Sequence, residues 1–276
     1  MAKAEELRKI ISEYDLMDTH AHLNDEPLLE QDDSIVELCE KERVIINNAG
    51  AQIEDSIAGV NQAKKYHNVF AMIGYHPYYI SYNHGCLNDA DEIVKQIEKI
   101  YLENRDYVLC IGEIGLEKIE DEKLYDIQKD TFIKLLALAR KYNLAVNLHV
   151  RNAHDDAITI LKEHAKGLRL IAHCFALDYS AAKDYLDLGC FIAVNGIITF
   201  EKKNDDILNA IPHIPQDKIL LETDCPFLTP VPYRGKQNNP SYIKYTFKKL
   251  ASLYQINEDQ LKEQLKKNAI KAFLDD

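Results

Sequence analysis

Short apolar runs rich in β-branched residues alternate with longer amphipathic stretches from residue 16 to about residue 224. Runs of four or five such residues predict strands, whereas apolar residues repeating every three or four positions predict helices, as in Tyr125–Arg140 and Asp155–His164. The eight predicted strands are Leu16–His20, Val44–Asn47, Val69–Ile73, Val108–Gly112, Ala145–His149, Leu170–His173, Phe191–Val194 and Ile219–Thr223.

This alternation predicts an α/β fold, a single (β/α)8 barrel of the TIM type, and the 276 residues suit one. A doubly wound open sheet is the alternative. Ionisable residues stand at or just past the ends of strands one, four, five, six and eight. A closed barrel gathers those ends around one mouth, whereas an open sheet spreads them along an edge, so we favour the barrel with its site at the C-terminal mouth.

Segments outside this alternation predict additional helices. Ala4–Glu13 indicates an added N-terminal helix, and a loop rich in Pro, Gly and Asn follows strand eight from Pro226 to Pro240. Tyr242–Leu253 and Glu258–Phe273 then predict two helices that cover the barrel. We therefore expect one domain over residues 1–276, with residues 1–13 and 241–276 as additions to the barrel.

The composition narrows the class of protein. With 46% hydrophobic and 28% charged residues, the chain can bury a large core. No apolar run approaches the roughly eighteen residues that span a bilayer, and the opening residues do not resemble a signal peptide. The six cysteines form no C-x-x-C pair, which favours reduced thiols. We expect a cytoplasmic monomer that does not bind membranes.

The net charge of −12 weighs against a protein that coats duplex DNA electrostatically. It leaves a nucleic-acid substrate open, because bound divalent cations can reverse the local potential where a phosphate lies.

Two histidines at the end of the first strand suggest a metal site. His20 and His22 are two residues apart, and residues at this spacing share one face of a strand. Asp18 is placed to orient an imidazole from behind. Alone, the pair is a weak signal, and Asp18 is also a common residue of strand-end turns.

Further candidates stand at the ends of four other strands. Glu113 follows an apolar run between glycines, where a buried carboxylate needs a partner or a metal. His149 and His173 end successive predicted strands, and Asp224 follows the last one. Glu222 is a candidate for the wall behind the ligands. One histidine at a strand end is usually structural, but two in successive units favour ligation.

Together these residues predict a dinuclear centre. The set is His20, His22, Glu113, His149, His173 and Asp224. Four imidazoles and two carboxylates suit two divalent cations such as Mg²⁺, Mn²⁺ or Zn²⁺, because a single catalytic zinc usually takes three protein ligands. We expect Glu113 to bridge the ions, about 4 Å apart, and Asp224 to orient the attacking water.

Cationic and aromatic residues near the same strand ends are candidates for substrate binding. They are Arg151, His76, and the loop residues Arg234 and Lys236, whose charges can hold a phosphate. Surface ion pairs and turns are the alternative for the cations. Tyr75, Tyr78 and Tyr79 can stack on bases or simply pack in the core.

The order of these motifs resembles the TatD-type metal-dependent deoxyribonucleases of the amidohydrolase superfamily. It runs H-x-H, G-E-I-G-L, H-x-R-x-A, H-C-F and E-T-D-x-P-x-L-x-P-x-P-Y-R-G-K-x-N-x-P, over residues 16–273. The resemblance implies that His20, His22 and Asp224 hold one ion and His149 and His173 the other, with Glu113 between them. It also implies Mg²⁺-supported 3′→5′ exonuclease action, chiefly on single-stranded DNA and also on RNA.

Two departures from the family pattern concern substrate preference. Glu117-Lys118 stands where the family usually has Asp-Tyr, and Ala176-Leu177 stands where it has a small residue and Gly. We expect phosphodiester hydrolysis by a metal-activated water. Hydrolysis of an amide, lactone or other ester is the alternative, and a barrel without activity would predict a broken ligand set.

Overall fold

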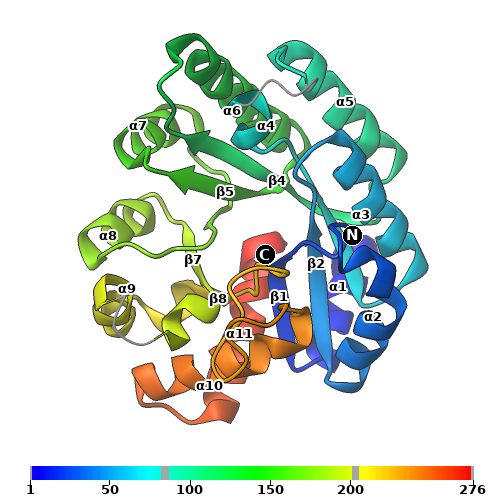
Figure 1. Ribbon diagram of the computed structural model, residues 1–276, viewed down its shortest axis with the longest axis vertical. Coiled ribbons are helices and arrows are strands. Elements are labelled where there is room, and N and C mark those ends of the chain that lie inside the picture. Colours follow the sequence, from blue (N-terminus) through cyan, green and yellow to red (C-terminus); the bar gives the residue numbers. More distant parts are fainter. Residues whose placement is uncertain (1, 82–86, 201–204, 275–276) are drawn as a thin grey trace.

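The computed structural model describes residues 2–81, 87–200 and 205–274. Its eight strands form one parallel sheet in sequence order (Figure 1). They are β1 (Leu16–Ala21), β2 (Val44–Ala49), β3 (Val69–Ile73), β4 (Val108–Glu117), β5 (Ala145–Arg151), β6 (Leu170–Ala172), β7 (Phe191–Val194) and β8 (Ile219–Leu221).

The first and last strands, β1 and β8, meet at a seam. The Thr19 hydroxyl donates to the Leu221 carbonyl at 2.9 Å. Beyond the strand ends, the Asp224 amide donates to the His20 carbonyl and the His22 amide to the Cys225 carbonyl, both at 2.9 Å. The eight strands thus form a nearly closed (β/α)8 barrel, which confirms the predicted fold and excludes the open doubly wound sheet.

Helices surround the strands (Figure 1). Aspartates begin three of them: the side chains of Asp89, Asp121 and Asp178 accept backbone N–H groups at the starts of α5, α6 and α8. The helices are α1 (Ala2–Glu13), α2 (Asp32–Lys41), α3 (Ile53–Lys65), α4 (Pro77–Ser81), α5 (Ala90–Glu103), α6 (Glu122–Tyr142), α7 (His154–His164), α8 (Tyr179–Asp187), α9 (Asp205–Ala210), α10 (Ile243–Tyr254) and α11 (Glu258–Phe273). The short 3₁₀ turns are η1 (Leu29–Gln31), η2 (Gly196–Thr199), η3 (Ile211–His213), η4 (Gln216–Lys218) and η5 (Pro240–Tyr242).

Strand alternation divides the apolar core into two clusters. Residues such as Ile46 and Ile192 belong to the cluster that includes the surrounding helices, and their neighbours Ile45 and Phe191 belong to a second cluster. The second cluster also contains residues of α1 and the end of α11, including Leu7, Ile11, Phe273 and Leu274. These two helices therefore cover the N-terminal end of the barrel, and they leave the C-terminal mouth uncovered.

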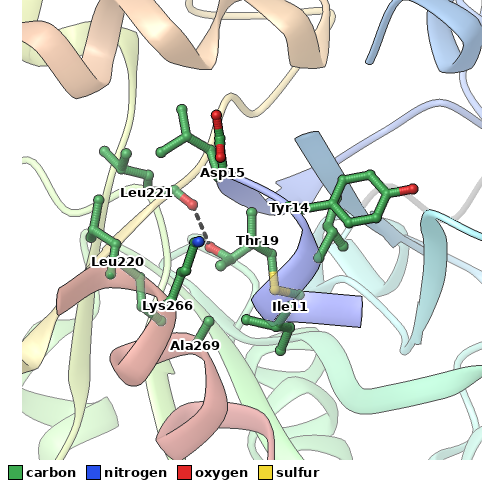
Figure 2. A pocket seen from close by; sticks show the side chains of 12 residues that line it. Ile11, Tyr14, Asp15, Thr19, Leu220, Leu221, Lys266 and Ala269 are labelled. Carbon is green, nitrogen blue, oxygen red and sulfur yellow. Dashed lines mark hydrogen bonds between the residues drawn. The ribbon is translucent and has the colours of Figure 1, made fainter. Parts of the chain in front are cut away.

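A small crevice lies at this covered end, among α1, β1, β8 and α11 (Figure 2). Its volume is about 10 Å³, room for about one water molecule. The crevice is a gap in the packing, too small for a substrate.

Several strands extend beyond their predicted ends. β4 continues to Glu117, so Glu113 lies inside the strand and not after it. The pairing of β4 with β5 shifts register between Ile111 and Ile114, a feature that apolar periodicity does not reveal.

Among the described residues, no helix is long and apolar enough to cross a membrane. Five cysteines are free thiols, and Cys86 lies outside the described residues.

Candidate metal centre at the barrel mouth

The six predicted ligands meet at the C-terminal mouth of the barrel. His20 lies in β1, Glu113 in β4 and His149 in β5. The other three, His22, His173 and Asp224, lie one to three residues past β1, β6 and β8. The rings of His20 and His173 stack with their centroids 3.6 Å apart, although their positions in the sequence are distant.

Glu113 lies between two groups of imidazoles. Its Oε2 is 3.4 Å from His20 Nε2 and 3.8 Å from His22 Nε2. Its Oε1 is 2.6 Å from His149 Nδ1 and 3.5 Å from His173 Nε2. His76 Nε2 also lies 3.4 Å from Oε1. The two carboxylate oxygens therefore face different groups of rings, the arrangement of a carboxylate that can bridge two ions.

Asp224 faces three of these rings from the seam between β8 and β1. Its Oδ1 lies 3.8, 3.6 and 3.7 Å from the Nε2 atoms of His20, His22 and His173. The residue has a left-handed φ of 55°, which aspartate tolerates better than most side chains do. The seam hydrogen bond from its amide to His20 holds this conformation.

Two sets of donor atoms, with no residue in common, fit divalent cations. Nitrogen and oxygen atoms of His20, His22 and Asp224 lie within 4.8 Å of one another, and those of Glu113, His149 and His173 do the same. Both sets consist of imidazoles and carboxylates, the donors that Mn²⁺, Zn²⁺ and related ions accept.

Charge in the centre is strongly coupled. Burial opposes protonation of His22, but Asp224 and Glu113 raise its pKa to about 9. Burial is likewise outweighed at His173, where Glu222, Glu113 and Asp224 raise the pKa to about 10. Against the effect of burial, the surrounding imidazoles hold the pKa of Glu113 well below its usual range. Without a cation, protons on the histidines thus balance the carboxylates.

Polar residues behind the ligands fix two of the rings. Asn147 Oδ1 lies 3.1 Å from His20 Nδ1, and Glu222 Oε2 lies 3.0 Å from His173 Nδ1. The other oxygen of Glu222 accepts from the Cys174 amide at 2.8 Å and from Asn195 Nδ2 at 3.0 Å. In both histidines the Nε2 atom is therefore left to face the centre.

Asp18 has a different role from the one expected. Its carboxylate accepts hydrogen bonds from the amide and hydroxyl of Thr223 and from the backbone amide of His20. It thus joins the ends of β1 and β8, and the contact with the His20 ring is made by Asn147 instead. Asp18 points to the backbone because the seam brings Thr223 next to it, a contact across more than two hundred residues that strand spacing cannot predict.

The glycines around Glu113 make room for neighbouring protein atoms. A Cβ on Gly115, whose φ is +151°, would lie 1.9 Å from the His149 carbonyl oxygen. A Cβ on Gly112 would lie 2.6 Å from Met72 Sδ. These two glycines let β3, β4 and β5 approach closely enough for Glu113 and His149 to meet.

A cavity of about 710 Å³ opens over the centre. Its wall from β4, β5 and the residue after β5 contains the polar side chains of Glu117, Arg151 and Asn152. Glu117 lies 3.9 Å from His149 Nε2 and 3.5 Å from an Arg151 guanidinium nitrogen. The sequence marked Glu117 only as a departure from the family pattern. Its pairing in register with Arg151 depends on the extension of β4 beyond the predicted end.

The other predicted substrate-binding residues divide between the cavity and its surroundings. His76, Tyr78 and Tyr79 line the cavity. Arg234 and Lys236 do not: both are exposed, the Arg234 guanidinium lies 3.7 Å from the centroid of the Phe200 ring, and the Lys236 ammonium lies 5.4 Å from that of Tyr233. Tyr75 is 3% exposed and its hydroxyl donates to the Leu87 carbonyl, so it is a core residue and not a stacking surface.

Comparison with known proteins identifies relatives along almost the whole chain. The family model described as TatD related DNase matches residues 17–274. The uncharacterized metal-dependent hydrolase YabD of Bacillus subtilis is 34% identical over 262 residues, which cover 94% of this chain and 98% of YabD. The uncharacterized metal-dependent hydrolase MG009 of Mycoplasma genitalium is 34% identical over 263 residues, with coverage of 93% and 98%.

Solved structures share the fold. The crystal structure of YjjV, a TatD homolog from Escherichia coli, has a TM-score of 0.85 at 26% identity and covers 94% of this chain and 97% of its own. The phosphotriesterase homology protein from Escherichia coli, solved with phosphate in its active site, has a TM-score of 0.65 at 15% identity, with coverage of 95% and 99%.

Proposed function

Because this chain belongs to the TatD related DNase family, we propose that it hydrolyses phosphodiester bonds of DNA. It is a metal-dependent hydrolase of the amidohydrolase superfamily. The proposed reaction is removal of nucleotides from the 3′ end of single-stranded DNA.

The position of Glu113 between two imidazole groups is the observation that carries the proposal. In the proposed centre, His20, His22 and Asp224 would hold one cation, His149 and His173 would hold the other, and Glu113 would be a ligand available to both. Two divalent cations in such a site lower the pKa of a water and neutralise charge on the phosphate oxygens. The candidate cations are Mg²⁺, Mn²⁺ and Zn²⁺, because carboxylates suit Mg²⁺ and Mn²⁺ and imidazoles suit Zn²⁺.

Asp224 is the proposed acceptor for the proton of the attacking water. Its carboxylate faces the middle of the cluster and is 14% exposed, so a water molecule can reach it from the cavity. Burial opposes ionisation, but the imidazoles of His173, His22 and His20 hold its pKa below the usual range, so the carboxylate is ready to accept a hydrogen bond from water.

His76 is proposed to donate a hydrogen bond to the substrate. The amide of Tyr78 donates to His76 Nδ1 at 2.9 Å, so a neutral ring must carry its hydrogen on Nε2. That atom lies 3.4 Å from Glu113 Oε1, next to the proposed centre. Burial lowers the pKa of His76 and favours the neutral ring. The Nε2–H group, which faces Glu113 here, is proposed to donate to a phosphate oxygen when substrate is bound.

Arg151 is the proposed contact for a second phosphate of the strand. It lines the cavity and its side chain is 68% exposed, but Glu117 pairs with it. A single positively charged side chain in the cavity wall suits a short stretch of single-stranded DNA better than a duplex. Arg234 and Lys236, outside the cavity, would contact the strand further from the cleaved bond.

A second reaction class keeps the same centre and changes the bond, to an amide, lactone or other ester. The specific observation in its favour is the acidic cavity wall, because Asp25 and Glu117 line it beside the two carboxylates of the cluster. Such a wall suits an uncharged substrate.

A nuclease assay on single-stranded DNA labelled at its 3′ end tests the proposal. We expect metal-loaded protein to release labelled mononucleotides with Mg²⁺ or Mn²⁺, and EDTA to stop the release. His149→Ala should lose it as well, whereas His67→Ala should retain it, because the His67 side chain is 71% exposed and pairs with Glu40 instead of the cluster. Absence of release from protein with measured metal content would reject the nuclease proposal, and hydrolysis of N-acyl or lactone substrates by the same sample would establish the alternative.

A further inference from the structure

Two apolar side chains that line the cavity are exposed to solvent, which is an unfavourable environment for apolar groups. Phe227 is 56% exposed and Leu177 is 44% exposed, and both line the cavity. Single exposed apolar residues are common on protein surfaces. Here, however, they share one arc of the mouth with Ile197 and Leu228, because the segments after β6, β7 and β8 are neighbours around the barrel.

Hydrogen bonds hold the backbone of Phe227 at both its amide and its carbonyl. Its amide donates to the Asp224 carbonyl at 2.9 Å, and its carbonyl accepts from Asn238 Nδ2 at 2.6 Å. Asn238 is fully buried and also donates to the Thr223 carbonyl at 3.0 Å. The same loop segment packs against η2, since a Cβ on Gly196 would lie 2.0 Å from the Leu228 carbonyl oxygen. The backbone that carries the exposed ring is thus held three residues after Asp224.

The walls of the cavity therefore differ in polarity. Its β4 and β5 wall carries Glu117 and Arg151, its floor carries the histidines and carboxylates, and its β6 to β8 wall is apolar. A volume of about 710 Å³ is typical of a pocket that encloses a small molecule or one end of a polymer. A bound group that reaches the floor with its phosphate can place its next substituent against the apolar wall.

We propose that Phe227 and Leu177 form a subsite for the nucleobase of the 3′-terminal nucleotide. This inference rests on the proposed nuclease function and names the part of the substrate that the cavity selects. A nucleobase offers a flat π-face to the Phe227 ring, and stacking of this kind does not depend on the base sequence. The enzyme would then read the presence of a terminal base and not its identity.

The discriminating substrates are two single strands that differ only at the 3′-terminal residue. One has an intact nucleoside there, and the other has an abasic tetrahydrofuran residue. We expect the wild-type protein to cleave the intact end with a kcat/KM about tenfold higher or more, which is the range of base stacking on one aromatic residue. Phe227→Ala should lose most of this preference, Leu177→Ala part of it, and Phe227→Tyr should keep it.

Val231→Ala is the matched control. Val231 is 44% exposed and belongs to the same loop, but it does not line the cavity, so its variant should keep the wild-type preference. Equal rates of the wild-type protein on the two strands would overturn the subsite while leaving the nuclease intact. An equal loss on both strands in Phe227→Ala would overturn it too, because that pattern indicates damage to the metal centre. If metal-loaded wild-type protein cleaves neither strand, the nuclease proposal fails and the subsite with it.

Discussion

At the scale of single residues, Glu113 has the most demanding position in the protein. It is 3% exposed, and its two oxygens face five imidazoles, from β1, from β5 and from the segments that follow β1, β3 and β6. A buried carboxylate is stable only with such partners, and here cations can replace the protons that the imidazoles otherwise carry.

Replacement of Glu113 by glutamine should separate the contribution of its negative charge from that of its size. Glu113→Gln keeps the size of the side chain but removes the negative charge and one ligand oxygen. We expect less than two bound metal ions per chain and a hydrolysis rate lower by about 100-fold or more, measured by elemental analysis and by the nuclease assay. The control Glu120→Gln changes an exposed carboxylate a few residues away. Full metal content and full activity in Glu113→Gln would contradict the proposed bridging role.

At the scale of elements, the meeting of β4 and β5 decides whether the centre can form. Gly115 allows the two strands to approach so closely that no Cβ fits between them, and this approach sets the distance from Glu113 to His149. The glycine is thus required by packing as well as by its backbone angle.

Two alanine substitutions distinguish these requirements. Gly167 has a φ of +81°, and a Cβ there would meet no heavy atom within 4 Å beyond its chain neighbours, so Gly167→Ala should cost only the backbone strain, about 1 kcal/mol of unfolding free energy. Gly115→Ala adds a collision with the His149 carbonyl and should cost about 3 kcal/mol or more, together with weaker metal binding. Urea unfolding in EDTA and metal titration measure the two effects. Equal costs at the two positions would show that the close approach is easily relaxed.

At the scale of the whole molecule, the proposed metal centre joins strands from both halves of the chain. The proposed ligands come from β1, β4 and β5 and from the segments after β1, β6 and β8. A cation bound by the folded barrel but not by the unfolded chain therefore stabilises the entire fold.

Metal stabilisation should grow as the pH rises from about 6 to about 8. In the metal-free protein, neighbouring carboxylates raise the pKa of His22 to about 9 and that of His173 to about 10 against the effect of burial. Both rings are then protonated across this range, and a cation must displace their protons, so its affinity increases with pH. The measurement is the difference in melting temperature with and without Mn²⁺ at each pH, with proton release followed by calorimetry in two buffers. A difference that stays constant or shrinks would contradict this linkage.

Much of the barrel could be predicted from the sequence because each strand and helix is indicated by the apolar pattern of its own segment. Every one of the eight predicted strands is present, and α11 has the predicted bounds Glu258–Phe273. Periodicity reports which face of a strand or helix is buried, and strand ends place ligands at one mouth once the fold is known. The residues of the proposed centre could be collected in this way without knowledge of any distance.

Only the tertiary structure decided how these residues contact one another. It placed Asp18 against Thr223, brought Glu117 to His149 and Arg151, and left Arg234 outside the cavity. It also gave Phe227 a fixed and exposed position through the buried Asn238. The physical reason is that such contacts depend on strand register, on the closure of the seam and on loop packing. These are set by interactions between segments far apart in the chain, whereas the pattern of apolar residues records only the environment of each segment by itself.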